Sequence, residues 1–168
     1  MAKIGIFYGS STGNTELVAE KIREAFGKDK ADLLNVDEAS VDDVLRYTYL
    51  VFGTSTWGVG DMQDDWEDFA EELKEADLKG RKIALFGVGD QDTYPESFAD
   101  GMGTLYARLK KSGAGFVGEW PVDGYIFDDS NALKGKKFVG LPLDLDNQDD
   151  LTDERIKKWV GQLKKIFK

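Results

Sequence analysis

The sequence predicts an α/β fold in which five parallel strands form a doubly wound sheet with helices on both faces. Short apolar runs alternate with amphipathic stretches along the chain. Three of these runs, IGIF, YLVF and IALF, are apolar at every position, which is typical of parallel strands buried on both faces. Because each helical crossover returns the chain in the same direction, this alternation requires a parallel sheet.

The apolar runs place the expected strands at residues 3–8, 32–36, 49–53, 82–87 and 115–119. Helical periodicity places helices at residues 14–26, 40–47, 63–75, 98–112 and 153–167. One face of the first helix and one face of the last are expected to be buried. Their residues are Leu17, Val18, Ile22 and Phe26 in the first helix, and Ile156, Trp159, Val160 and Leu163 in the last.

The segment from residue 120 to residue 137 has no clear period and is rich in residues that favour turns. An apolar run then resumes at residues 138–143. We therefore expect the last strand to be interrupted by a loop of about twenty residues, which is long enough to suggest a function. The whole chain, residues 1–168, is expected to form a single domain.

Composition narrows the chemistry that the chain can perform. Cysteine and histidine are both absent, which excludes disulfides, thiolate nucleophiles and imidazole bases. The formal net charge of -10 disfavours nucleic acid and favours partners that present a basic patch. No apolar run approaches the roughly 20 residues that span a bilayer, and the first residues lack the pattern of a signal peptide. We therefore expect a cytoplasmic protein without membrane insertion.

Small polar residues fill the turn between the first strand and the first helix, at residues 9–15 (GSSTGNT). Backbone N–H groups, hydroxyls and the positive end of the helix dipole would converge there on an anion, which predicts a phosphate site. The turn lacks the G-K-[ST] of a Walker A sequence and contains no Lys or Arg. A permanently held phosphomonoester therefore fits it better than a transferred phosphoryl group. The alternative is an ordinary polar turn in which Ser or Thr caps the helix.

Two further loops follow the third and fourth strands, at residues 54–61 and 89–95, and each carries a large aromatic residue, Trp57 or Tyr94. In a doubly wound sheet these loops lie beside the phosphate turn, at the crevice where ligands bind. An exposed aromatic side chain is costly unless something covers it, so the pair indicates a flat aromatic ligand held between two rings. For each ring alone, packing against its own loop is the alternative.

Carboxylates are frequent in the segment that follows the loop at residues 54–61 and in the neighbouring loop that carries Tyr94. They are Asp61, Asp64, Asp65, Glu67, Asp68, Glu71, Glu72 and Glu75, with Asp92, Glu96 and Asp100 on the neighbouring loop. A negative rim of this kind would steer a basic partner toward the site, although a solvated helix face is the alternative. Lysines, in contrast, crowd the last helix.

The three loops resemble the FMN-binding loops of flavodoxins. The matching stretches are SSTGNT at residues 10–15, STWGVGD at residues 55–61 and GVGDQDTYPESF at residues 87–98. The segment at residues 120–143 is similar to the insertion that defines the long-chain subgroup, and the likeness extends from residue 3 to the final helix. The resemblance implies a monomeric, low-potential carrier that holds FMN non-covalently and works mainly between its semiquinone and hydroquinone forms. It would pass electrons between redox proteins, without substrate turnover or a bound metal of its own.

The resemblance also assigns the cofactor-binding residues position by position. Those around the FMN phosphate would be Ser10, Ser11, Thr12, Gly13, Asn14 and Thr15. Those around the ring and the ribityl chain would be Trp57 and Tyr94 on the faces, Thr56, Gly58, Gly89 and Asp90 at the polar edge, and Asp146 at the ribityl chain. Some relatives carry a larger residue where this chain has Gly58. Glycine there should ease the turning of the following peptide when the flavin is reduced.

Two other classes of protein share the expected topology. An FMN-dependent NAD(P)H:quinone oxidoreductase would need a second substrate pocket above the flavin, whereas Trp57 and Tyr94 are expected to cover both faces of the ring. A response-regulator receiver needs a phosphoacceptor aspartate at the end of the third strand, where this chain has GTS at residues 53–55. The receiver is therefore excluded, and the oxidoreductase stays as the alternative.

Overall fold

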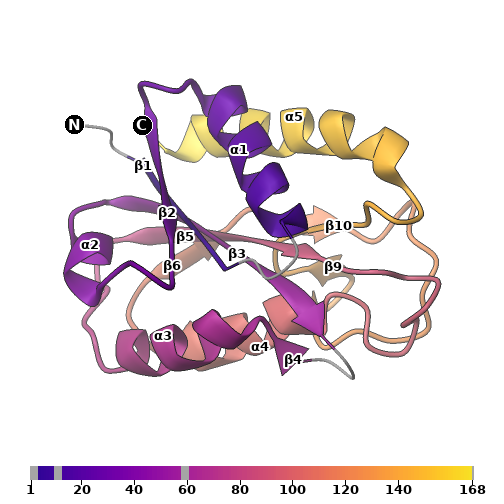
Figure 1. Ribbon diagram of the computed structural model, residues 1–168, viewed down its shortest axis with the longest axis horizontal. Coiled ribbons are helices and arrows are strands. Elements are labelled where there is room, and N and C mark those ends of the chain that lie inside the picture. Colours follow the sequence, from indigo (N-terminus) through magenta and orange to yellow (C-terminus); the bar gives the residue numbers. More distant parts are fainter. Residues whose placement is uncertain (1–3, 10–12, 58–60, 168) are drawn as a thin grey trace.

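Residues 4–9, 13–57 and 61–167 are described in the computed structural model, which Figure 1 shows as a sheet between two layers of helices. The sheet contains β1 (Ile4–Tyr8), β2 (Ala31–Asn35), β3 (Tyr49–Trp57), β5 (Lys82–Val88), β6 (Gly115–Val117) and β10 (Leu141–Leu143). Its order is β10-β5-β3-β1-β2, and the pairings among these strands are parallel. The predicted doubly wound sheet is confirmed.

The last position of the sheet is shared by two short strands. β6 pairs with residues 82–84 of β5, and β10 pairs with residues 86–88 of the same strand. The prediction of a last strand interrupted by a long loop is therefore confirmed. Within the interruption, β7 (Trp120–Pro121), β8 (Leu133–Lys134) and β9 (Lys137–Phe138) form a small antiparallel sheet in the order β7-β9-β8. The apolar run at residues 138–143 is thus divided between two sheets and is not one strand.

Helices cover both faces of the large sheet (Figure 1). On one face α1 (Asn14–Phe26) packs beside α5 (Asp149–Ile166), and on the other α3 (Asp64–Lys74) packs beside α4 (Asp100–Leu109). The short α2 (Val41–Leu45) contacts α3. In the described part of the chain, no helix is long and apolar enough to cross a membrane.

Two boundaries differ from the prediction for identifiable reasons. β3 runs to Trp57 rather than to residue 53, because Thr54 and Ser55 continue the pairing with β5. Beyond them Trp57 pairs antiparallel with Asp61 in β4 (Asp61–Met62). α5 begins at Asp149 rather than at residue 153, since carboxylates in its first turn suit the positive end of the helix dipole but show no apolar period.

Three tryptophans pack in the core, and one of them is Trp159 on the expected buried face of α5. Trp66 and Trp159 are fully buried, and Trp120 is nearly so. The indole N–H of Trp66 donates to the carbonyl of Gly53 at 2.7 Å, and that of Trp159 donates to the carbonyl of Gly118 at 2.8 Å. Both buried indoles thus satisfy their donor.

The expected buried face of α1 is wrong at one position. Leu17 is 45 % exposed, whereas Val18 and Ile22 are completely buried. One residue step turns about 100° around a helix, so Leu17 and Val18 point to different sides.

Gly140 marks a close approach between the chain just before β10 and the backbone of β5. A Cβ atom on Gly140 would lie 2.1 Å from the carbonyl oxygen of Leu85, which is backbone and cannot move aside. We expect Gly140→Ala to lower the free energy of unfolding by about 2–4 kcal/mol, as overpacking and local backbone shifts do. Urea denaturation followed by circular dichroism measures it.

Gly161 supplies the matched control, because a Cβ there would meet nothing within 4 Å in the described part of the chain and the residue lies inside α5. Gly161→Ala should stabilise the protein by about 0.5–1 kcal/mol through helix propensity. Equal effects of the two substitutions would contradict the close approach at Gly140.

Candidate functional site

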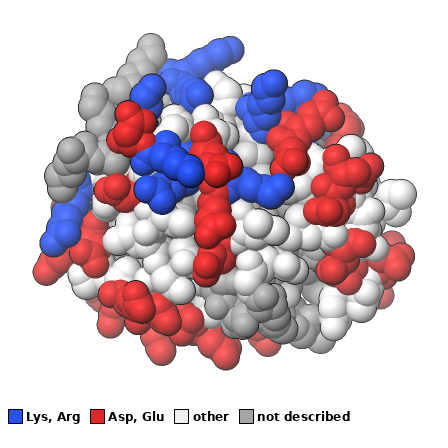
Figure 2. Space-filling view, turned by 45° about the horizontal axis from the view of Figure 1, so that its top comes forward, with Lys and Arg blue, Asp and Glu red and all other residues white. Residues whose placement is uncertain are grey.

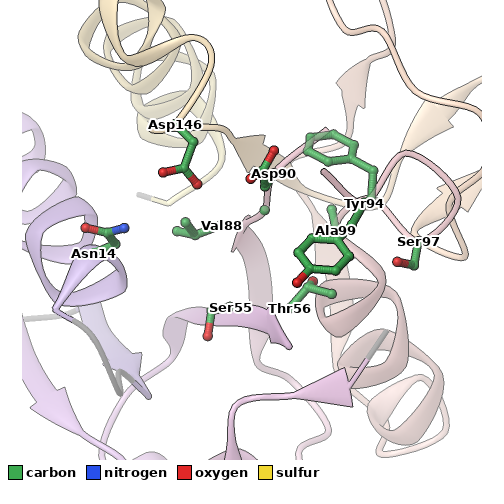
Figure 3. Close-up of a pocket in the computed structure, with 11 residues that line it drawn as sticks. Asn14, Ser55, Thr56, Val88, Asp90, Tyr94, Ser97, Ala99 and Asp146 are labelled. Atoms are coloured by element: carbon green, nitrogen blue, oxygen red, sulfur yellow. The ribbon is translucent and has the colours of Figure 1, made fainter. Parts of the chain in front are cut away.

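A cavity of about 300 Å³ opens at the carboxyl ends of β3 and β5 (Figure 3). It is lined by Asn14, Ser55, Thr56, Val88, Gly89, Asp90, Tyr94, Ser97, Phe98, Ala99 and Asp146. These residues come from the start of α1, from β3, from β5 with its following loop, and from the loop after β10. The place where the strand order of a doubly wound sheet reverses, here at β1 with β2 and β3 on either side, is where such folds bind ligands.

The structure brings many of the predicted site residues to this cavity. Those that line it are Asn14, Thr56, Gly89, Asp90, Tyr94 and Asp146. Gly13 and Thr15 adjoin Asn14 but do not line it, and Thr15 is buried. Ser10, Ser11, Thr12, Gly58 and the side chain of Trp57 lie outside the described residues. Five other residues line the cavity without having been assigned a role. Ser55, Val88, Ser97 and Phe98 lie in the stretches that resemble FMN-binding loops, and Ala99 lies outside them.

The start of α1 carries no side-chain cap. The cap residue is Gly13, in the left-handed conformation with φ 94°, and its carbonyl accepts the N–H of Leu17 at 3.0 Å. Glycine, rather than Ser or Thr, therefore occupies the N-cap position of this helix. Asn14 extends from the first position of α1 toward the cavity (Figure 3). A helix N-terminus that ends at such a cavity is suited to an anionic group.

The hydroxyl of Ser55 has no hydrogen-bond partner among the described residues, although it is buried. An unsatisfied buried hydroxyl costs about 1–3 kcal/mol, and such groups in native structures call for an explanation. Ser55 lines the cavity, but in Figure 3 its hydroxyl points away from the other lining residues, so we do not assign it to a ligand.

Tyr94 presents a large aromatic ring at the cavity while remaining 46 % exposed. Its loop is fixed by backbone hydrogen bonds from Tyr94 N–H to the carbonyl of Asp90 at 3.0 Å and from Ser97 N–H to the carbonyl of Tyr94 at 3.3 Å. A half-exposed ring held in place in this way favours a flat ligand that stacks on it.

Asp90 shapes the turn that leads to Tyr94. Its Oδ1 atom accepts the backbone N–H of Asp92 at 3.1 Å, that of Thr93 at 2.9 Å, and the side-chain amide of Asn147 at 2.8 Å. Partial burial works to raise the pKa of Asp90, but these hydrogen bonds to the ionised form outweigh it, so the pKa lies below its ordinary value. Asp90 is therefore negative at neutral pH.

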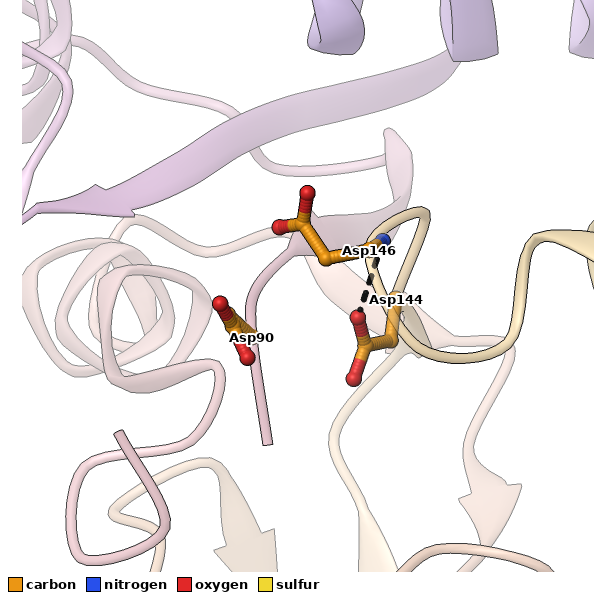
Figure 4. A group of neighbouring side chains, drawn as sticks. All are labelled: Asp90, Asp144 and Asp146. Atoms are coloured by element: carbon orange, nitrogen blue, oxygen red, sulfur yellow. Dashed lines mark hydrogen bonds between the residues drawn. The ribbon is translucent and has the colours of Figure 1, made fainter. Parts of the chain in front are cut away.

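Asp144 is a buried carboxylate that ties two loops together (Figure 4). It accepts backbone N–H groups from Gln91 at 3.0 Å, Asp146 at 3.2 Å and Asn147 at 3.0 Å, and the side-chain amide of Asn147 at 2.9 Å. Because N–H donors take up its lone pairs, we assign Asp144 the role of a brace. Asp144 was not among the site residues expected from the sequence. The signal was a carboxylate directly after the buried run at residues 141–143.

Asp146 stands beside these two carboxylates and lines the cavity. Partial burial, and then the charges of Asp90 and Asp144, raise the pKa of Asp146 above its ordinary value. The cavity edge thus has a negative potential, which would oppose the addition of negative charge to a ligand there.

Basic and acidic side chains gather on different parts of the surface. In Figure 2, Lys and Arg lie mainly in the upper half of the view, whereas carboxylates line its lower and right-hand edges. The exposed lysines of α5 are Lys157, Lys158, Lys164 and Lys165. On and beside α3, the exposed carboxylates are Asp61, Asp64, Asp68, Glu71, Glu72 and Glu75. Glu67 is paired with Arg108 at 2.8 Å, and Asp65 accepts the side-chain amide of Gln63 at 2.8 Å, so these two carboxylates also have structural roles.

Comparison with known proteins gives one consistent result. The family model described as flavodoxin matches residues 6–159. A flavodoxin from Nostoc sp. is 51% identical over 165 residues, which cover 98% of this chain and 97% of that protein. Flavodoxin 1 from Azotobacter vinelandii is 47% identical over 171 residues, covering 99% and 98%.

A solved structure agrees with these relatives. The crystal structure of Fusobacterium nucleatum flavodoxin bound to flavin mononucleotide matches with a TM-score of 0.94 and 34% sequence identity, and the match covers 100% of both chains. With a family model that spans most of the sequence and relatives that match over nearly their full length, this chain belongs to the flavodoxin family.

Proposed function

We propose that this chain binds one FMN in the cavity at the carboxyl ends of β3 and β5 and carries single electrons between redox proteins. The observation that carries the proposal is the cavity itself, which joins a helix N-terminus to an aromatic ring. A family relative of known structure is bound to the same flavin.

The start of α1 would hold the FMN phosphate. The residues assigned to it are Ser10, Ser11, Thr12, Gly13, Asn14 and Thr15. Since residues 9–16 contain no Lys or Arg, neutral donors and the helix dipole would satisfy a phosphate that keeps its charge.

The other loops would hold the ring and the ribityl chain. Trp57 and Tyr94 would flank the ring, backbone groups of Thr56, Gly58, Gly89 and Asp90 would meet its polar edge, and Asp146 would approach the ribityl chain. Covered faces would exclude water and leave an edge for electron exit.

FMN supplies the one-electron chemistry, and the protein tunes it. Without histidine or cysteine, the chain offers neither an imidazole base nor a thiolate nucleophile, and we assign it no substrate turnover of its own. The charges of Asp90 and Asp146 at the cavity edge oppose each added electron, which lowers the potential of the flavin. The bound flavin would thereby become a strong reductant.

The partners would be redox proteins with basic docking patches, to which the carboxylates on and beside α3 are complementary. We place the protein in the cytoplasm and treat it as one domain. We propose a monomer, because a carrier exchanges partners most readily when a single copy presents its flavin edge.

The proposed cofactor is tested by mass analysis of the extracted chromophore and by stepwise reduction of the purified protein. We expect one FMN per chain and two separate one-electron stages in the absorption spectrum. Recovery of FAD would overturn the assignment of the α1 start, since that turn suits a single terminal phosphate. Rapid reduction by NAD(P)H alone, without a partner protein, would instead support the oxidoreductase.

Asp146→Asn should raise the potential at which the second electron is added. A unit charge about 10 Å away, at an effective dielectric of about 40–80, contributes about 0.4–0.8 kcal/mol, which is about 15–35 mV for one electron. Because the pKa of Asp146 is raised, its charge is lost as pH falls, so the difference from wild type should shrink toward acid pH. Potentiometry at several pH values measures this.

The matched control is Asp29→Asn, which removes an exposed carboxylate beyond the far end of α1. It should leave both potentials unchanged. Equal shifts in the two variants would show that net charge, rather than the position of Asp146, sets the potential.

Neutralising Asp61, Asp64 and Asp68 together should slow association with a basic redox partner and flatten its salt dependence. These carboxylates are exposed, whereas Asp65 and Glu67 are left intact because of their structural contacts. Stopped-flow rates at several ionic strengths give the measurement.

A variant of equal charge, neutralised at Glu20, Glu24 and Asp29 on and after α1, serves as the control. FMN affinity should change little in either variant. Unchanged rates at low salt in the first variant would assign the α3 carboxylates to solubility alone.

A further inference from the structure

Ile126 is the most exposed large apolar side chain in the described part of the structure. It is 83 % exposed, compared with 46 % for Tyr94, 45 % for Leu17 and 37 % for Leu45. Single exposed apolar residues are ordinary on protein surfaces. Ile126 differs in how its backbone is held and in where it lies.

The residues on both sides of Ile126 are anchored to the core. The hydroxyl of Tyr125 donates to the carbonyl of Pro142 at 2.6 Å, and the guanidinium of Arg155 lies 4.0 Å from the centre of its ring. The ring of Phe127 packs on Phe138 at 5.4 Å between centroids. With its neighbours turned inward, Ile126 points to solvent from a fixed backbone, so little conformational freedom would be lost when a partner covers it.

Ile126 also lies next to the candidate flavin site. Its backbone N–H donates to the side-chain oxygen of Gln91 at 2.6 Å, and Gln91 directly follows the cavity residue Asp90. Further along, the backbone N–H groups of Asp128 and Asp129 donate to the carbonyl of Pro95, at 2.7 Å and 3.0 Å, directly after Tyr94. In Figure 1, the orange insertion runs beside the loop that follows β5. The side chain of Ile126 and the loop that carries Asp90 and Tyr94 therefore lie on the same side of the molecule.

The exposed charges of the two segments next to Ile126 have one sign, and the guanidinium of Arg155, which lies on the ring of Tyr125, is buried. In residues 90–97 and 121–131, every charged side chain is a carboxylate. The exposed ones are Asp92, Glu96, Asp123, Asp128 and Asp129. An apolar side chain surrounded by carboxylates is complementary to an apolar surface that is ringed by Lys and Arg.

We propose that Ile126 is the apolar anchor of a docking surface for redox proteins whose exposed cofactor edge is apolar and ringed by basic side chains. This inference rests on the proposed function, since it takes the partner to be an electron donor or acceptor. The anchor lies on the insertion, apart from the carboxylates of α3, so the two surfaces act differently. The carboxylates steer the encounter and weaken with salt, whereas contact through Ile126 holds the complex and is insensitive to salt.

A c-type cytochrome with a ring of lysines around its haem edge provides a defined probe. One electron passes from the reduced flavoprotein to the ferric haem, which becomes ferrous. Ile126→Ala should weaken binding of the oxidised holoprotein to this cytochrome about tenfold, as expected when one buried aliphatic side chain is lost from a contact. Calorimetry gives the affinity, and the fall should be similar at low and at high ionic strength. In stopped-flow reduction, the cytochrome concentration that gives half of the maximal rate should rise by the same factor.

Two further variants make the result specific. Ile126→Gln keeps the length of the side chain but not its apolar character, and it should behave like Ile126→Ala. Leu45→Ala removes an exposed apolar side chain from α2, which lies just before the amino end of β3, whereas the cavity lies at the carboxyl end of that strand. This variant should bind and react like wild type. FMN content and thermal stability should be the same in all variants, because each keeps the backbone N–H that donates to Gln91.

The outcomes separate the two proposals. Wild-type affinity and rate in Ile126→Ala, or an equal loss in Leu45→Ala, would overturn the docking inference and leave the carrier function intact. A wild-type protein that held FMN but reduced no cytochrome would contradict the carrier function itself. A loss in Ile126→Ala that disappeared at high salt would also contradict the inference, because an apolar contact is not screened.

Discussion

The buried carboxylate of Asp144 is the interaction on which the geometry of the site depends. It accepts the N–H of Gln91 from the loop after β5 and those of Asp146 and Asn147 from the loop after β10. The amide of Asn147 is shared between Asp144 and Asp90, and Asp90 in turn forms the turn that presents Tyr94. Without that carboxylate these donors would be unpaired, at about 1–3 kcal/mol for each one that is buried. One side chain therefore sets the position of the aromatic ring, of the carboxylates at the cavity edge and, through Gln91, of the insertion.

Hydrogen bonds within the site explain how Asp90 stays ionised although other carboxylates lie beside it. The N–H donors around Asp90 keep its pKa low, so it stays ionised, whereas Asp146 has fewer compensating donors and a raised pKa. A site built in this way holds negative charge beside its ligand at neutral pH, and the energy for doing so comes from hydrogen bonds already present in the fold. Tuning of a bound cofactor then needs no residue that acts as an acid or a base.

The features that could be predicted were those that depend on residues close together in the sequence. The apolar runs and the helical periods gave the parallel sheet, the polar turn at residues 9–15 gave Asn14, and the aromatic residue of its loop gave Tyr94. The resemblance of the loops to those of flavodoxins gave Thr56, Asp90 and Asp146, and all five residues line the cavity. Asp144 was missed because its meaning lies in the contact with Gln91, 53 positions away, which no local pattern records. Within the insertion, strands of two residues are too short to show a period, so the small sheet of β7, β8 and β9 could not be distinguished from a loop.

The insertion illustrates how a redox carrier can combine fast encounter with ready release. Long-range attraction between opposite charges speeds association but adds little to the lifetime of a complex, which depends on the contacts that are desolvated. Complexes that exchange electrons bury small areas, so they can rely on very few such contacts. A single aliphatic side chain held by two anchored neighbours, Tyr125 and Phe127, meets this requirement, because its rigid mounting keeps the entropic loss small while its size keeps the affinity modest. The aromatic core of the insertion would then serve to hold that one side chain beside the loop that carries Tyr94.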